Sequence, residues 1–383
     1  MTWSTRSTRQ SKKDLKIKHM KRFFILASAA LIAASCASQE PQGIKDAFEG
    51  KFLIGTALNA WEITGADTAG VALVKKHFNS IVAENCMKNE EIHPEENVYN
   101  FELADKFVEF GEANGMFIIG HCLVWHSQLA KWFPYDENGE YVTPEVLKQR
   151  MKDHITTVVT RYKGRVNGWD VVNEAIIEDG SYRKSPFYDI LGEEFIPWAF
   201  ECAHAADPDA ELYLNDYGMS DPGRRDGYVK LIGQLKERGL RIDAIGMQAH
   251  VGLDYPTIEQ FEESLMAFAG TGINVMITEW DMSALPTVNM GANVSDWAEY
   301  REQLNPYKNG LPEDVSALWN SRMKEFMELF LKHSDVVTRV TAWGVSDNDS
   351  WKNNWPIPGR TDYCLLFDRN LEPKPFLNEY LNK

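Results

Sequence analysis

Two glutamates lie at the ends of apolar runs, in settings that suit acid–base chemistry. Glu174 ends the segment VNGWDVVNE and follows directly after the amide of Asn173. Glu279 ends the segment INVMITE, two residues before Asp281. If both runs are buried strands that point the same way, the two carboxylates face each other at one end of a sheet. Hydrolysis of a glycosidic bond needs such a pair, one as acid/base and the other as nucleophile.

A histidine is placed to contact Glu279 and Asp281 together. Residues two apart in an extended chain lie on the same side. His250, from the neighbouring strand-like run, could therefore bridge the two carboxylates and hold Glu279 ionised and oriented. His121 and His250 also have an ordinary interpretation as histidines satisfied within the core. Neither belongs to an HExxH motif or has a histidine four residues away, so we predict no metal site.

A set of polar and aromatic residues lies at or just beyond the carboxyl ends of the expected strands. A structural explanation would serve for any one of them, but it would have to hold separately for every member of the set. Barrel enzymes keep their active sites at this end of the strands. The residues are Glu174, Glu279, His121, Trp125, Asn215, Tyr217, Gln248, His250, Trp343 and Trp351.

Short β-rich runs alternate with segments of helical period, which is typical of βα units around a parallel sheet. The expected strands are 52–58, 80–86, 116–124, 165–174, 210–217, 244–250, 274–280 and 337–346. The expected helices are 67–77, 101–114, 144–162, 186–206, 224–238, 257–269, 314–334 and 374–382. Eight units of each kind predict an α/β fold, a single (β/α)8 TIM barrel with its active site at the C-terminal ends of the strands. An open doubly wound sheet is the alternative, but no GxGxxG turn follows the first strand.

The N-terminus has the pattern of an export signal. A basic pair precedes the apolar segment 23–34, which is too short to span a bilayer. The sequence AAS before Cys36 resembles a bacterial lipobox, in which the cysteine carries the lipid. We expect residues 1–36 to be an N-terminal extension with a lipoprotein-type signal peptide, and the protein to be an exported outer-membrane or cell-surface lipoprotein. Cleavage after Ala37, which gives a secreted or periplasmic protein, is the alternative.

Composition limits the partners. Residues 37–46 read as a linker and 47–383 as one catalytic domain, which is long enough to bury a large core. The whole chain has a formal charge of -16, and without residues 1–35 it holds 32 Lys and Arg against 55 Asp and Glu, a charge of -23. Nucleic acid is therefore not an expected partner. The 12 Trp and 14 Tyr favour a neutral substrate such as a sugar.

The cysteines other than Cys36 show no CxxC spacing. They are Cys86, Cys122, Cys202 and Cys364, and three of them fall in apolar runs. A free thiol in such a run behaves as a small hydrophobic residue. We expect no zinc site.

Eight segments occur in the order of one known family: FLIGTALN, FNSIVAENCMK, GHCLVWHSQL, WDVVNEA, LYLNDYG, IGMQAH, ITEWD and TAWGVSDNDSW. With them, the chain from about Phe52 to Leu381 resembles family 10 glycoside hydrolases, the endo-β-1,4-xylanase family. The resemblance implies a (β/α)8 barrel, a retaining mechanism and xylan or xylo-oligosaccharides as substrates. We expect no cofactor, a monomer, and membrane contact only through a lipid on Cys36.

The resemblance also implies roles for individual residues. Glu174 would be the acid/base and Glu279 the nucleophile, with carboxyl groups about 5–5.5 Å apart as in retaining sites. Asn173 would contact the 2-hydroxyl of the sugar at the cleavage point. Support for Glu279 would come from Gln248, His250 and Asp281. Residues that bind sugar or line the cleft would be Glu84, Asn85, Lys88, His121, Trp125, Gln128, Asn215, Tyr217, Gln248, His250, Trp343 and Trp351.

Three positions depart from the family pattern and leave subsite strength open. Asn89 stands where Trp often follows the lysine, Ala130 where Pro is common, and Trp280 where Leu is usual. Two other functions stay open at this point. One is hydrolysis of a β-1,4-glucan or mixed-linkage glucan. The other is a catalytically silent xylan-binding barrel, which is disfavoured because both carboxylates are present.

Overall fold

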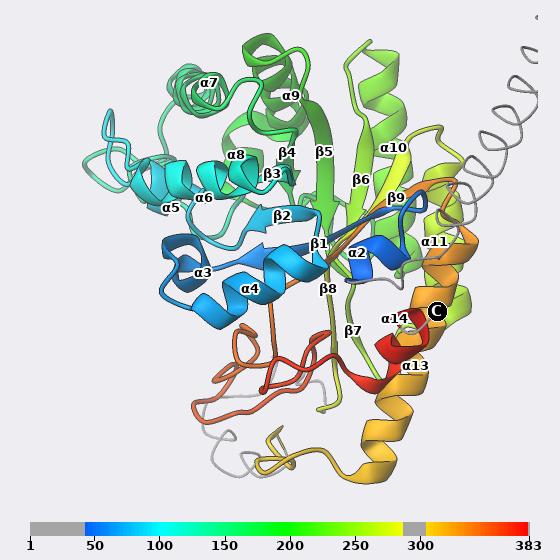
Figure 1. Ribbon diagram of the computed structural model, residues 1–383. Helices are drawn as coiled ribbons and strands as arrows, with labels where there is room; N and C mark the ends of the chain where they lie inside the picture. The colour runs from blue at the N-terminus through cyan, green and yellow to red at the C-terminus, as the bar shows by residue number, and fades with distance from the viewer. Residues whose placement is uncertain (1–42, 286–303, 382–383) are drawn as a thin grey trace, which may run out of the picture. The chain divides into compact units, whose positions relative to one another are not determined.

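The computed structural model describes residues 43–285 and 304–381, and in them eight parallel strands close into a barrel (Figure 1). These strands are β1 (Leu53–Leu58), β2 (Ser80–Ala83), β3 (Phe117–Val124), β4 (Gly168–Asn173), β5 (Glu211–Asp216), β6 (Ala244–Met247), β8 (Asn274–Ser283) and β9 (Val337–Ala342). Each pairs in parallel with its neighbours, and the β6–β8 pairing closes the ring. The predicted (β/α)8 barrel is confirmed.

Helices connect the strands and pack outside the barrel. The longer ones are α4 (Thr68–His77), α6 (Glu102–Ala113), α7 (Pro144–Arg161), α9 (Phe195–Ala206), α10 (Pro222–Glu237), α11 (Ile258–Ala269) and α13 (Glu313–Lys332). The shorter ones are α2 (Ile44–Ala47), α3 (Ala60–Thr64), α5 (Asn89–Ile92), α8 (Pro186–Leu191), η1 (Gly192–Glu194), η3 (Pro375–Leu377) and α14 (Asn378–Leu381). None of the helices in the described part of the chain is long and apolar enough to cross a membrane.

Several segments differ from the sequence prediction. The expected helix 186–206 is interrupted at Gly192, whose φ of +59° takes the chain out of the helical region. The expected strand 244–250 ends at Met247, and after Ala249, with φ +62°, the chain enters a further strand, β7 (His250–Gly252). Helix α2 begins with the buried Ile44, inside the expected linker. Residues 37–42 of that linker and Cys36 lie outside the described residues.

Side-chain caps place the helix starts close to where the sequence predicts them. Asp67 accepts hydrogen bonds from two backbone amides in the first turn of α4, and Asp221 does the same for α10. Thr143 and Ser185 cap α7 and α8, each of which has a proline in its first turn. Such caps satisfy amides that have no partner within the helix. The loops that leave the barrel strands are thereby tied to fixed helix ends.

The barrel interior is filled with side chains. A small buried cluster takes one residue from most of the strands: Ala57, Val82, Ile119, Tyr213, Ala244, Met276 and Trp343. Trp343 follows directly after β9, so it forms the carboxyl-end layer of this packing. A separate, larger cluster joins the outer faces of the strands to the helices. The carboxyl ends of the strands therefore stand on a packed floor, which keeps them rigid.

Candidate active site

Glu174 and Glu279 both lie at the carboxyl end of the barrel, but in different local structure. Glu174 is the first residue after β4. Glu279 lies within β8, which continues for four more residues because β7 pairs with it from Asp281 to Ser283. The sequence prediction that this strand ends near Glu279 is therefore wrong. The register of the β8–β9 pair shifts between Ile277 and Trp280, a bulge of the kind that re-aims side chains next to active sites.

The Glu279 carboxylate is buried, and each of its oxygens has a hydrogen-bond partner. Only 5% of the residue is exposed. Asn215 Nδ2 donates to Oε1 over 2.7 Å, and His250 Nε2 lies 3.1 Å from Oε2. Burial by itself would raise the pKa of this carboxyl, but the hydrogen bond with His250 and the proximity of His121 outweigh it, so the pKa of Glu279 is lowered. Glu279 is held in its ionised form.

His250 lies between Glu279 and Asp281. Its Nδ1 is 2.9 Å from Asp281 Oδ2, and Asp281 is completely buried. Burial opposes the charged imidazole, but the two carboxylates raise the pKa of His250 to about 9. Burial also opposes ionisation of Asp281, yet His250 and Lys352 lower its pKa to about 2. The group is therefore a chain of alternating charges behind Glu279.

Lys352 and Trp351 complete this chain. Lys352 Nζ lies 2.7 Å from Asp281 Oδ1, and Trp351 Nε1 donates to Asp281 Oδ2 over 3.0 Å. The Trp351 ring meets His250 edge-on at 5.4 Å and lies 5.0 Å from Trp355. Sequence reasoning placed Trp351 among the residues that bind sugar or line the cleft, and missed Lys352. Its position directly after Trp351 is the only signal that the sequence offers for it.

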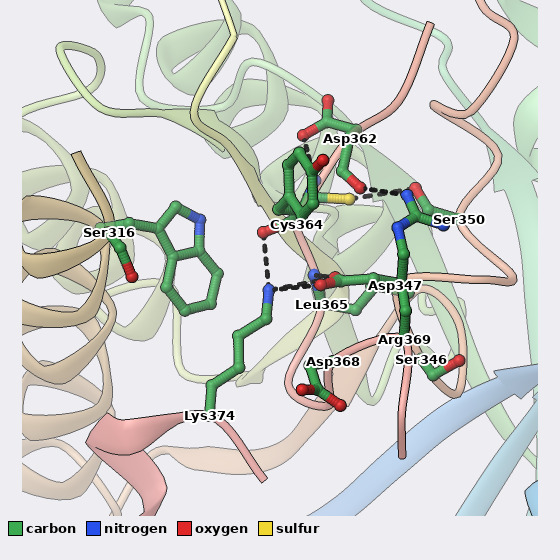
Figure 2. A network of polar contacts seen from close by, with 12 residues as sticks. Ser316, Ser346, Asp347, Ser350, Asp362, Cys364, Leu365, Asp368, Arg369 and Lys374 are labelled. Atoms are coloured by element: carbon green, nitrogen blue, oxygen red, sulfur yellow. Dashed lines mark hydrogen bonds and ion pairs between the residues drawn. The ribbon is translucent and has the colours of Figure 1, made fainter. Parts of the chain in front are cut away.

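A second buried network holds the loop that carries Trp351 and Lys352. Figure 2 shows Lys374 reaching the carboxylate of Asp347, with Nζ 3.0 Å from Oδ1 and 2.9 Å from Oδ2. Burial raises the pKa of Asp347 to about 6, and Lys374 limits that rise. In the same view Ser350 Oγ lies 3.0 Å from Cys364 Sγ. Both ends of the short loop before Trp351 are therefore fixed to the chain beyond it.

The Glu174 carboxylate has longer contacts. Its side chain is 13% exposed, and Oε1 lies 3.4 Å from Asn173 Nδ2 and 3.3 Å from Gln248 Nε2. His126 Nε2 is 4.0 Å from Oε2, and the pKa of His126 is lowered to about 4, by burial first and by Arg183 second. His126 is thus neutral at neutral pH. Among the described residues, Glu174 faces amides and a neutral imidazole, with no ion pair of the kind that holds Asp281.

The backbone at Glu174 is strained and firmly held. Its φ of +58° is rare for a residue with a side chain and costs roughly 1–3 kcal/mol. The Glu174 amide donates to Asn215 O over 2.8 Å, and its carbonyl accepts from Arg183 Nε over 2.8 Å. The next amide, of Ala175, donates to Tyr228 Oη. This conformation turns the side chain out of the strand line, and strain of this kind is typical of functional positions.

Asn215 joins the two halves of the site. It is fully buried, and its Nδ2 contacts both Glu279 Oε1 and the side-chain amide of Asn173, the latter at 3.0 Å. Thr278 Oγ1 donates to Asn215 Oδ1 over 2.6 Å, which fixes the orientation of the amide. Since the Asn215 carbonyl also binds the Glu174 backbone, one residue of β5 positions both glutamates.

A second group of predicted residues lies at the ends of β2 and β3. Lys88 Nζ donates to Asn85 Oδ1 over 2.9 Å and to Gln128 Oε1 over 2.7 Å, and lies 4.9 Å from the Trp125 ring centre. Burial raises the pKa of the Glu84 carboxyl, and Lys88 partly offsets this. A cation, amides, a carboxyl and an indole side by side suit the hydroxyls and faces of a sugar.

The remaining predicted residues have structural partners as well as a place at the site. His121 Nδ1 lies 2.8 Å from Asp170 Oδ2, and its ring meets Trp343 edge-on at 5.3 Å. Tyr217 Oη accepts from Arg183 Nη2 over 3.0 Å. The structure thus brings the predicted residues together at one end of the barrel. Sequence reasoning missed Arg183, although it is only nine residues beyond Glu174.

Metal-binding side chains are not clustered in the described part of the chain. In residues 43–285 and 304–381 no group of three or more His, Cys, Asp and Glu side chains could hold a metal ion. Cys86, Cys122, Cys202 and Cys364 are free and buried. What this arrangement offers chemically is one carboxylate held ionised, a second less tightly bound carboxylate, and side chains that bind hydroxyl groups.

Comparisons with known proteins agree with this chemistry. The family model described as Glycosyl hydrolase family 10 matches residues 43–383. The chain is 49% identical to endo-1,4-beta-xylanase A of Xylanibacter ruminicola, over 94% of this chain and 97% of that protein. It is 40% identical to a beta-1,4-xylanase of Dictyoglomus thermophilum, over 91% and 92%.

Solved structures show the same likeness. A GH10 endoxylanase retrieved from a sugarcane soil metagenome superposes with a TM-score of 0.83 at 44% identity, over 89% of this chain and 99% of that one. An intracellular xylanase of Thermoanaerobacterium saccharolyticum, solved as a mutant in complex with xylotriose, gives a TM-score of 0.76 at 32% identity, over 88% and 98%. The fold and the sequence of this chain therefore match the same group of proteins.

Proposed function

The chain belongs to glycosyl hydrolase family 10, and from that premise we propose that it is an endo-1,4-β-xylanase that hydrolyses internal β-1,4-xylosidic bonds of xylan by a retaining double displacement. Glu174 is the acid/base and Glu279 the nucleophile. The observation that carries this assignment is the hydrogen bonding of Glu279 to Asn215 and His250, which holds a buried carboxylate ionised. A nucleophile must be ionised before the substrate arrives.

The first step uses both glutamates. Glu279 Oε attacks the anomeric carbon while Glu174 gives its proton to the departing glycosidic oxygen, so the C–O bond breaks as the glycosyl-enzyme bond forms. In the second step Glu174, now ionised, takes a proton from water, and that water replaces Glu279 at the anomeric carbon. Two inversions give net retention. This mechanism requires the two carboxyl groups to lie about 5–5.5 Å apart.

The other predicted residues hold the sugar. Asn173, whose side-chain amide contacts Glu174 and Asn215, binds the 2-hydroxyl of the sugar at the cleavage point. Lys88, Asn85 and Gln128 form a connected group that binds hydroxyls of the neighbouring sugar. Trp343 and Trp351 supply the apolar floor and wall. Each of these contacts orients the anomeric carbon between the two carboxylates.

Azide distinguishes the two glutamates. Glu174→Ala should nearly abolish hydrolysis of xylan, but it should still form the glycosyl-enzyme from a dinitrophenyl xylobioside, whose leaving group needs little protonation. Turnover should then stall, and azide should relieve the stall and give a β-glycosyl azide. Glu279→Ala should fail on both substrates, with at most an α-azide. A β-azide from Glu279→Ala and not from Glu174→Ala would reverse the assignment.

A substrate comparison tests the choice of polysaccharide. Release of reducing ends from xylan should far exceed release from carboxymethylcellulose and from mixed-linkage glucan, and NMR should show the β-anomer first. Equal rates on the three polymers would contradict the xylanase assignment. Binding to xylan with no hydrolysis by a folded protein would instead support a silent carbohydrate-binding barrel.

We also propose that the protein is exported and carries a lipid on Cys36. The support is the basic pair, the apolar segment 23–34 and the sequence AAS before Cys36. The wild-type protein should partition with membranes, and Cys36→Ala should be released or left unprocessed. A soluble wild-type protein with a mature N-terminus at Ser38 would contradict lipidation.

A further inference from the structure

The two peptide groups on either side of the Glu174 Cα are both fixed by hydrogen bonds. The amide of Glu174 donates to Asn215 O over 2.8 Å, and its carbonyl accepts from Arg183 Nε over 2.8 Å. In the same peptide group as that carbonyl, the N–H of Ala175 donates to Tyr228 Oη over 3.0 Å. Because the two peptide planes set φ and ψ of Glu174, these three bonds hold its left-handed conformation, with φ +58°.

The hydroxyl of Tyr228 is itself held by a buried carboxylate. Tyr228 Oη donates to Asp216 Oδ2 over 2.5 Å, and both residues are completely buried. Burial first, and Asp216 second, raise the pKa of the Tyr228 phenol well above its ordinary value, so the phenol keeps the proton that it donates. With this proton directed at Asp216, the Tyr228 oxygen presents a lone pair to the amide of Ala175. The pair therefore gives that amide an acceptor of fixed direction.

Asp216 is costly to bury in its charged form. Burial raises the pKa of its carboxyl to about 7, whereas Arg224 and then the hydrogen bond from Tyr228 oppose this rise. The Glu174 carboxylate is among the charges that raise it. The other oxygen of Asp216, Oδ1, accepts from the Tyr217 amide over 2.8 Å. An ionised Asp216 accepts both bonds, whereas a proton on either oxygen would face another donor.

These contacts form a closed ring around the peptide group that follows Glu174. From Asp216 the ring passes along the chain to Tyr217, whose hydroxyl accepts from Arg183 Nη2 over 3.0 Å. Arg183 Nε then returns to the carbonyl of Glu174. Hydrogen bonds that share donors and acceptors in this way strengthen one another. The ring consists of Glu174, Ala175, Tyr228, Asp216, Tyr217 and Arg183.

Helix α10, which carries Tyr228, lies close to the loop after Glu174 because two of its glycines face that loop. A Cβ at Gly223 would clash with the backbone of the loop, and a Cβ at Gly227 would lie 2.8 Å from Gly180 O. Glycine inside a helix is less favourable than alanine. The sequence of α10 therefore loses some helix stability at two positions, and in return Tyr228 comes within reach of the loop.

We propose that Tyr228 and Asp216 are positioning residues for the acid/base. Tyr228, supported by Asp216, fixes the peptide group that turns the Glu174 carboxyl toward the glycosidic oxygen. This inference rests on the proposed xylanase function and on its assignment of Glu174, and it adds two buried residues that act through the backbone. Loss of either residue should therefore impair proton transfer by Glu174 and spare the attack by Glu279.

The dependence on the leaving group tests the role of Tyr228. Tyr228→Phe removes only the hydroxyl, and kcat/KM for xylo-oligosaccharides should fall roughly 10–100-fold, since a misplacement of about 1 Å can cost a factor of this size. For a dinitrophenyl xylobioside, whose leaving group needs little protonation, kcat/KM should stay within about twofold. Its kcat should fall, because Glu174 is also the base of the second step. Azide, which needs no base, should restore that kcat.

Tyr182→Phe is the matched control. Tyr182 lies in the loop after Glu174, and its hydroxyl donates to Gln234 Oε1 of the same helix α10 over 3.1 Å, a bond that does not involve the peptide group after Glu174. This variant should keep the wild-type kcat/KM for every substrate. Equal losses of Tyr228→Phe on both kinds of substrate would overturn the proposal, because a role in stability alone lowers both alike. No loss beyond that of Tyr182→Phe would overturn it as well.

Asp216→Asn tests the carboxylate, and it carries the test if Tyr228→Phe does not fold. Asparagine has one acceptor oxygen for the two donors that Asp216 binds, so xylo-oligosaccharide hydrolysis should fall roughly tenfold with the same dependence on the leaving group. Equal losses on both substrates would mean that Asp216 only stabilises the fold. A wild type that hydrolyses no xylan would instead refute the proposed function. Equal losses on both substrates for Glu174→Gln would refute the assignment of the acid/base.

Discussion

Within β8, the Glu279 carboxylate contacts Asn215 at 2.7 Å and His250 at 3.1 Å. Directly after β4, the Glu174 carboxylate contacts Gln248 at 3.3 Å and Asn173 at 3.4 Å. Glu279 is backed by a charged chain through His250 and Asp281. Glu174 faces amides and a neutral histidine. The same residue type is thus held by charge in one place and by longer, uncharged contacts in the other.

The difference matches the tasks that we propose for the two residues. A nucleophile keeps one protonation state, so strong hydrogen bonds to its ionised form favour it. An acid/base must gain and lose a proton in every cycle, and a charged partner would oppose one half of that cycle. In this molecule the short hydrogen bonds of Glu174 are made instead by its backbone, with Asn215 and Arg183. The backbone position of Glu174 is therefore fixed by short hydrogen bonds.

The largest expected effect on activity comes from replacing Glu279 and Glu174, one at a time, with glutamine. Glu279→Gln should lower turnover of every substrate by roughly 10⁵-fold, the scale seen when a nucleophile is lost. Glu174→Gln should lower xylan hydrolysis by roughly 10³-fold. Its first step on an aryl xylobioside with a good leaving group should change little. Pre-steady-state release of the phenol measures that step, and equal losses for both variants on this substrate would remove the proposed distinction.

The next effect should come from Asn215, which touches both glutamates. Asn215→Ala removes the donor to Glu279 Oε1 and should lower kcat by roughly 10²–10³-fold, as for a lost donor to a reacting charge. Thr278→Val is the matched control, because it removes only the 2.6 Å bond that orients the amide. It should cost much less. If the two variants lose the same activity, the role of Asn215 is in packing and not in binding Glu279.

The pH dependence of the free energy of unfolding should reveal the ion pair of His250 and Asp281 behind Glu279. The pKa of His250 is raised to about 9, so its contribution is complete below about 6.5 and is lost as the pH rises through 9. The pKa of Asp281 is lowered to about 2, so its contribution is complete above 3.8 and is lost as the pH falls toward 2. Both contributions are therefore complete between 3.8 and 6.5.

Asp281→Asn should lower the free energy of unfolding by about 2 kcal/mol within that window. The difference from the wild type should shrink above pH 9, where His250 loses its charge. Melting temperatures of both proteins, measured by calorimetry from pH 4 to 10, give this difference. Asp335→Asn, at an exposed aspartate, should show no such pH dependence. A constant deficit at every pH would mean that Asp281 acts through packing alone.

The sequence predicted the barrel and the place of both glutamates because a repeat of buried strands and amphipathic helices is a local pattern. It could not predict that β8 runs on past Glu279, since that depends on β7, whose pairing with Asp281 exists only in the folded chain. The turn before β7 has a positive φ at Ala249, a position where no glycine indicates such a turn in the sequence. The role of Lys352 could not be predicted for the same reason, because its partner Asp281 is distant in the sequence.

The smallest effect, and the finest test of the comparison, concerns Lys352. Its Nζ lies 2.7 Å from Asp281, which in turn binds His250, so its charge reaches Glu279 only through two other groups. Lys352→Met removes a cation from this buried chain and should therefore raise the pKa of Glu279. Less of the nucleophile is then ionised in acid, and the acid limb of the kcat/KM profile should move to higher pH, with a loss of about tenfold on that limb. Lys352→Arg keeps the charge and should restore the wild-type limb, while Lys332→Met, at an exposed lysine, should leave it in place. An acid limb that stays fixed in Lys352→Met would show that the pKa of Glu279 is set by its nearer partners His250, His121 and Asn215.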